Sequence, residues 1–125
     1  MSHAYEYVVL RCVPRVDREE FVNVAVVLHC QAADFLDVVW QCDAARLRAL
    51  DPDVDVESVC DALDFVDGVC AGDARGGAAA ARPRTQRFGF LKAPRSTVVQ
   101  PGPVHGGLTA DPDAELERLA DRLVR

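Results

Sequence analysis

Long apolar runs are absent from this sequence of 125 residues. A membrane-spanning helix needs roughly 20 consecutive apolar residues, and no run approaches that length. Residues 1–5 have a polar character and are followed by Glu6, so a secretory signal is not expected. Eight glycines and seven prolines are ordinary numbers, which excludes a collagen-like or wholly disordered chain. We therefore expect one soluble globular domain over residues 1–125, located in the cytoplasm and not associated with a membrane.

The sequence also lacks the spacings that hold metals and cofactors. Its five cysteines stand at positions 12, 30, 42, 60 and 70, and no two of them have the two-residue gap of zinc or redox motifs. The three histidines have no ligand-like spacing, and neither a phosphate loop nor a dinucleotide fingerprint is present. No metal and no cofactor are therefore expected. Because every cysteine has apolar neighbours, we expect reduced thiols in the core, in agreement with a reducing compartment.

Basic residues are missing from one long stretch and acidic residues from the next. Residues 51–73 contain eight acids and no base, whereas residues 74–110 contain six bases and no acid. The two blocks either neutralise each other across one surface, or the basic stretch meets an external anion. The chain as a whole has 14 basic and 20 acidic residues, and this net charge of −6 disfavours binding to nucleic acid.

Three segments near the N-terminus show the period of two that is typical of β-strands. They are residues 5–13, 21–30 and 35–42, and the second has an apolar residue at every even position. The even positions from 8 to 12 and from 36 to 42 are apolar as well. We therefore expect an antiparallel three-strand meander, with 21–30 in its centre and the even positions on one shared core face.

The opposite face of this meander is predicted to carry a row of polar residues. If Cys12 pairs with Val22, then Arg11 pairs with Asn23, and a three-residue turn at 31–33 places Gln41 beside Asn23. The solvated side of an antiparallel sheet often has this composition.

Helices are predicted after the meander and at the C-terminus. Val56–Cys70 keeps an apolar stripe at helical spacing and is followed by Gly72, while Asp111 and Pro112 open a similar stripe that ends at Val124. Shorter features complete the prediction. They are a helix capped by Asp43, Pro52 in a first helical turn, a flexible loop at 72–84, and a hairpin of 87–91 with 96–100.

This order of elements predicts the α+β class. We expect a mostly antiparallel sheet, built from the N-terminal three-strand meander plus a later hairpin, with the two main helices packed on one face.

A polar segment at residues 93–100 is the best candidate for a ligand site. Arg95 offers a guanidinium fork for a carboxylate or phosphate, Ser96 and Gln100 can orient the ligand, and His105 can transfer a proton. The other wall would come from the segment before and within the central strand, namely Arg15, Glu20 and Asn23. In the alternative interpretation, the hydroxyls satisfy a turn and Arg95 pairs with an acid of residues 51–73.

Several short motifs resemble a bacterial family called domain of unknown function 3037. They are Tyr5-Glu6-Tyr7, VPRVDREEFVNV at 13–24, APRSTVVQ at 93–100, Pro103-Val104-His105 and Gly107-Leu108-Thr109. The resemblance covers nearly the whole chain and carries no catalytic residue with it. It implies a stand-alone cytoplasmic protein that is often encoded near a HipA-like kinase-type protein.

Two hypotheses about function follow. In the first, the chain is a non-catalytic binding or accessory protein that docks on a HipA-like kinase-type partner, which suits its small size and segregated charge. In the alternative, it is a small enzyme or ligand sensor for a phosphorylated or carboxylated compound and uses an Arg95/Ser96/His105 pocket. RNA binding through Arg82, Arg84 and Arg87 ranks third, because few aromatic residues are interleaved with them.

Overall fold

The computed structural model describes residues 1–125 and contains one antiparallel sheet and five α-helices. The strands are β1 (His3–Cys12), β2 (Val22–Cys30), β3 (Phe35–Trp40), β4 (Val99–Pro101) and β5 (His105–Thr109). The helices are α1 (Ala44–Leu50), α2 (Val56–Ala71), α3 (Gly77–Ala80), α4 (Arg84–Lys92) and α5 (Pro112–Leu123). One-turn 3₁₀ helices occur at Val16–Arg18, Gln31–Ala33 and Ala74–Gly76. The predicted α+β class and the three-strand meander β1-β2-β3 are confirmed.

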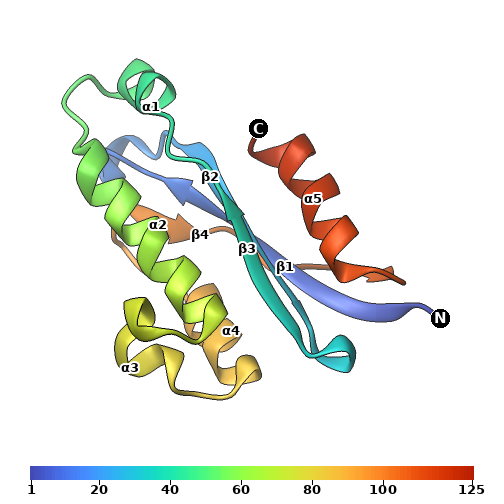
Figure 1. Ribbon diagram of the computed structural model, residues 1–125. Helices are drawn as coiled ribbons and strands as arrows, with labels where there is room; N and C mark the ends of the chain where they lie inside the picture. Colours follow the sequence, from blue (N-terminus) through green and yellow to red (C-terminus); the bar gives the residue numbers. More distant parts are fainter.

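Strand β1 lies inside the sheet. It pairs with β2 along one edge, while β4 and β5 share its other edge, β5 beside His3–Tyr7 and β4 beside Leu10–Cys12. The strand order is β3-β2-β1-β4, with β5 also paired to β1 (Figure 1). Every pairing in the sheet is antiparallel.

The sheet is covered on both faces. One core joins the even positions of β1, such as Val8 and Leu10, to α2 and α4, whereas a second core joins Tyr5 and Leu28 to α5. Figure 1 shows α2 and α5 on opposite sides of the strands. The expectation that both main helices pack on one face is therefore wrong. The physical reason is that β2 is buried at every residue from Val24 to Cys30, so its two faces each need a cover.

A β-bulge in β2 changes the predicted register. The expected pairs Cys12↔Val22 and Arg11↔Asn23 are present, but the next pair is Leu10↔Ala25, which leaves Val24 without an opposite residue. Beyond the bulge, even positions of β1 oppose odd positions of β2, so the even positions of the three strands do not share one face.

The predicted turn between β2 and β3 is also one residue too short. It has four residues, and the fourth, Asp34, adopts a positive φ of 52°. As a result, the backbone N–H of Gln41 donates to the carbonyl of Val24 (2.8 Å) and Gln41 does not extend the Arg11–Asn23 row.

The helix ends follow the local sequence. Asp43 accepts from two backbone N–H groups of α1, Asp111 caps α5, and Gly72 ends α2 with φ 74°. Pro52 is not in a first helical turn, because α2 begins four residues later behind the capping Asp55.

The predicted later hairpin is wrong in its first strand. Residues 87–91 belong to α4, and residues 99–101 pair with β1. The alternation of Phe88 and Phe90 is compatible with a strand over five residues, but Phe88 and Leu91 share a helix face and are both buried. Residues 72–84, expected to be a loop, include the 3₁₀ turn and α3, and their flexibility stays a prediction.

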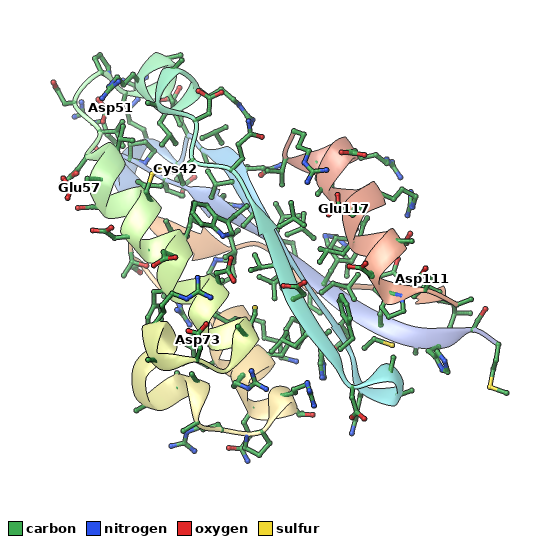
Figure 2. The ribbon with its side chains drawn as sticks, viewed as in Figure 1. Cys42, Asp51, Glu57, Asp73, Asp111 and Glu117 are labelled. Atoms are coloured by element: carbon green, nitrogen blue, oxygen red, sulfur yellow. A yellow bond between two sulfur atoms is a disulfide. The ribbon has the colours of Figure 1, made fainter.

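A disulfide joins Cys42, just after β3, to Cys60 on α2. Figure 2 shows Cys42 beside the first half of α2. The expectation of reduced thiols is therefore wrong for these two residues. Cys12, Cys30 and Cys70 are free and buried, and burial raises the pKa of the Cys12 and Cys70 thiols, so they are poor nucleophiles.

No helix has both the length and the apolar character that crossing a bilayer requires.

Reduction of the Cys42–Cys60 bond is expected to lower the free energy of unfolding. The bond links residues 18 positions apart, and closing a loop of this size stabilises a protein by about 3 kcal/mol. Thermal unfolding followed by circular dichroism should show a Tm lower by roughly 10 °C in excess reductant. The Cys42→Ser/Cys60→Ser double variant serves as the control, because its Tm should not respond to reductant. An unchanged Tm for the parent protein would contradict a stabilising role for the bond.

Acid is expected to weaken the contact that attaches α5 to β1. The Arg118 guanidinium and the Tyr5 hydroxyl both donate to the carboxylate of Glu115, and these hydrogen bonds, the one from Arg118 most of all, lower the pKa of Glu115 from 4.5 to about 2 against the opposing effect of burial. A group with a depressed folded-state pKa stabilises the fold above its unfolded pKa and loses this effect as the pH falls through the folded value. Glu115→Gln should therefore lower the Tm at pH 7, and the difference from the parent should shrink between pH 4.5 and pH 2. Glu117→Gln is the matched control, because its pair with Arg125 is exposed and worth little. Equal effects of the two variants would contradict the assignment.

Candidate functional site

The sequence-predicted site residues do not share one cavity. Arg15 and Glu20 line a small polar hollow of about 160 Å³ together with Arg18 and Asp51. Glu20 is exposed there and pairs with Arg18. His105 lies on β5, where its ring stacks on Tyr7 with centroids 5.2 Å apart. These residues therefore occupy separate regions of the surface.

Two predicted residues, Asn23 and Gln100, flank Arg11 across the sheet. Arg11 pairs with Asn23 on β2 and with Gln100 on β4, so the three side chains share the face that also carries α5. The side-chain amide of Asn23 donates to the carbonyl of Leu123 (3.1 Å), near the end of α5. The predicted polar row thus exists, but its third member is Gln100 and not Gln41.

The guanidinium of Arg11 is held by packing. It lies 4.0 Å from the ring centroid of Phe21, and a Cβ on Gly102 would come within 2.5 Å of it. Its Nε is buried and has no hydrogen-bond partner. Arg11 and Gln100 line a hollow of about 350 Å³ with Glu19 and Phe21, so a carboxylate shares the wall with the arginine.

Arg95 completes the end of α4. Its Nε donates to the carbonyl of Ala93 (3.3 Å), another of its nitrogens donates to the carbonyl of Phe90, and its guanidinium lies 4.8 Å from the Phe90 ring. Basic side chains commonly satisfy the last carbonyls of a helix in this way. No acid of residues 51–73 forms an ion pair with Arg95. Ser96 is exposed and makes no hydrogen bond within the chain, so Arg95, Ser96 and His105 do not form one pocket.

An apolar groove lies between α2, the end of α4 and β4. Its volume is about 310 Å³, and eight of its twelve lining residues are hydrophobic. The lining residues are Leu10, Ser58, Val59, Ala62, Phe65, Val66, Leu91, Arg95, Thr97, Val98, Val99 and Pro101. We refer to this set as the apolar groove.

The local sequence explains why the groove stays open. Pro94 ends α4, and the Thr97 hydroxyl donates to the carbonyl of Val99 (2.8 Å), which turns the chain toward β1. The carbonyl of Val98 then accepts from the Val13 N–H (2.7 Å), and this leaves the Val98 side chain 42% exposed. On α2, the small side chain of Ala62 sits between larger neighbours at helical spacing.

The rim of the groove is aromatic. Phe65 is 36% exposed, Phe90 is 40% exposed, and their rings meet edge to face with centroids 6.2 Å apart. Exposed aromatic and arginine side chains around an apolar hollow are typical of interaction sites. Phe65, Phe90 and Val98 could not be identified from the sequence, because single exposed apolar residues carry no signal in a pattern of helices and strands.

Acidic side chains border the groove on α2. Asp61 is exposed and lies one helical turn from Ser58 and Phe65 of the groove, and the exposed Glu57 lies one turn before Asp61. Figure 2 shows Glu57 pointing outward from α2. Further along α2, Asp64 and Asp67 pair with Arg75 of the following 3₁₀ turn, which also pairs with Asp73. Arg75 therefore offsets part of the negative charge at the C-terminal end of the acidic block, while Glu57 and Asp61 in its N-terminal part form no ion pair.

No metal centre accompanies the groove, since the structure contains no group of three or more His, Cys, Asp or Glu side chains arranged to hold an ion.

No curated protein and no solved structure matches this chain. The family model described as "Protein of unknown function (DUF3037)" matches residues 7–124, nearly the whole sequence. The chain therefore belongs to the DUF3037 family of proteins of unknown function.

Proposed function

We propose that this chain is a non-catalytic binding or accessory protein and that the apolar groove is its docking site for a partner protein. The observation that carries the proposal is the groove itself, an open hollow of about 310 Å³ with Phe65, Phe90 and Val98 exposed around it. Exposed apolar surface of this kind costs free energy in water, and a partner that covers it recovers this cost.

The charge around the groove indicates the chemistry of the partner. Glu57 and Asp61 form no ion pair within the chain, and Asp61 lies one helical turn from Ser58 and Phe65 of the groove. An apolar segment flanked by Lys or Arg would place its apolar side chain in the groove and its cations against α2. Arg95 also lines the groove, so the cations of the partner would lie toward Asp61 on α2 and away from Arg95.

A HipA-like kinase-type protein is the candidate partner, because the family resemblance implies that such a protein is often encoded nearby. The alternative function, a small enzyme or ligand sensor with an Arg95/Ser96/His105 pocket, is less well supported. Arg95 lines the apolar groove, whereas His105 stacks on Tyr7 elsewhere on the sheet.

Introducing a charge at the groove is expected to weaken the complex. The chain would be co-expressed with a HipA-like protein from the same genome, and the Kd of the purified pair would be measured by calorimetry. Val98→Asp should raise the Kd by roughly tenfold or more, because a charged side chain would replace the apolar one that the partner covers. The Tm should fall only slightly, since Val98 is already 42% exposed in the free protein.

Val104→Asp is the matched control, because Val104 is also 42% exposed but does not line the groove. Equal weakening by both substitutions would overturn the groove as the docking site. Absence of any complex would instead overturn the HipA-like partner.

The cytoplasm is the proposed location, and its support is the family resemblance. Disulfides are rare in reducing compartments, so the Cys42–Cys60 bond argues in the other direction. Fractionation of the native cells with alkylation of thiols under denaturing conditions tests both points together. Recovery outside the cytoplasmic fraction would contradict the proposed location, and the alkylation pattern of Cys42 and Cys60 would report whether the bond is formed there.

A further inference from the structure

A polar cavity of about 360 Å³ lies between the β2–β3 turn and the first turn of α4. It shares no lining residue with the apolar groove. None of its lining residues is a hydrophobic side chain, and they are His29, Gln31, Asp34, Pro83, Arg84, Thr85 and Arg87. We refer to this space as the polar cavity.

Arg87 forms the fixed wall of the polar cavity. It is only 8% exposed, and its Nη1 donates to the carbonyls of Val69 and Cys70, both at 2.8 Å, at the end of α2. Gly72 leaves room for this contact, because a Cβ there would lie 3.1 Å from Nη1. The Nε is buried without a hydrogen-bond partner, and no carboxylate pairs with the guanidinium. Arg87 therefore brings to the wall of the cavity a positive charge that forms no ion pair.

The first turn of α4 faces the same space. The helix spans nine residues and begins behind Pro83, which supplies no capping side chain, so the N–H groups of its first turn have no side-chain acceptor. Such N–H groups, together with the positive end of the helix dipole, bind anions. Arg84 and Thr85 project from this turn into the cavity lining, and neither makes an ion pair or a side-chain hydrogen bond.

His29 closes the inner side of the polar cavity. It is 7% exposed, and its ring packs against Phe88 with centroids 5.0 Å apart. Burial lowers its pKa, and the nearby Lys92 and Arg84 act in the same direction against the opposing effect of Glu6. A neutral imidazole donates one N–H and makes no ion pair of its own, so it can add a hydrogen bond to an anion.

We propose that the polar cavity binds the phosphate group of a small phosphorylated compound. Two guanidinium groups, a hydroxyl and the first turn of α4 converge there, against one opposing carboxylate from Asp34. A carboxylate ligand has two oxygens that can accept from these donors, whereas a phosphate has at least three and carries more charge. One water occupies about 30 Å³ of liquid, so 360 Å³ also leaves room for the group that carries the phosphate. This inference is independent of the docking groove.

Titration with inorganic phosphate and with glycerol 3-phosphate, at constant ionic strength and pH, tests the site. Two-dimensional NMR of the histidine rings reports the location, because the chain has only three histidines, at positions 3, 29 and 105. Both probes should shift the ring signals of His29 and leave those of His3 and His105 in place. Arg84→Gln should raise the Kd by roughly tenfold, since it removes one charge-assisted contact. Arg84 is used in preference to Arg87, because Arg87 also holds the end of α2.

Arg82→Gln is the matched control. It removes the same charge two residues away, from a side chain that donates to Gln86 (3.3 Å) and does not line the cavity. The parent affinity in Arg82→Gln, with weaker binding in Arg84→Gln, supports the proposal. Equal weakening in both variants would show a general effect of charge and overturn it, as would unperturbed His29 signals at saturating probe. Tighter binding of glycerol 3-phosphate than of inorganic phosphate identifies a phosphorylated compound as the ligand, and the reverse order identifies free phosphate.

Discussion

The pairing of β1 on both of its edges is the constraint on which the rest of this structure depends. β2 takes one edge, and β5 and β4 divide the other between His3–Tyr7 and Leu10–Cys12. This pairing places β1 beside β2, which is buried at every residue from Val24 to Cys30, so the chain needs a cover on each side of the sheet. Helices α2 and α4 cover one face and α5 covers the other. The groove exists because β4 is short and joins this sheet at its edge beside α2.

The local parts of this fold could be predicted from the sequence, because their causes lie within a few residues. Asp43, Asp111 and Gly72 mark helix ends through bonds to neighbours along the chain, and the pair Arg11↔Asn23 follows from alternation. The two-faced core could not be predicted in the same way. β2 is apolar at odd and even positions alike, so its pattern does not specify which of its residues face which helix. The one-residue bulge then exchanges the faces on which its odd and even positions lie relative to β1.

The candidate sites were harder to predict, because they depend on distant contacts. Gln100 belongs to the polar row because β4 pairs with β1 at Arg11. Arg95 and His105 lie apart because the chain between them first pairs with β1 as β4, and His105 then pairs with Tyr7 further along the same edge. The disulfide is a similar case, since Cys42 and Cys60 carry no spacing motif and meet only when α2 packs on the sheet. For the groove, the relevant side chains are ordinary apolar residues whose exposure depends on what fails to cover them.

Helix α4 links the polar cavity to the apolar groove. The two ends of α4 differ in how their free backbone groups are satisfied. Arg95 donates to a carbonyl at the C-terminal end, whereas no side chain caps the N-terminal end. Phe88 and Leu91 hold the helix in the core, so it cannot shift without disturbing the packing on α2. A phosphate at the N-terminal end would bind beside the Arg87 contact that fixes α4 to the end of α2, so ligand and helix would share one anchored side chain. The groove is built from the other end of the same helix, where Arg95 is engaged with the last carbonyls, so the two sites draw on different side chains of α4.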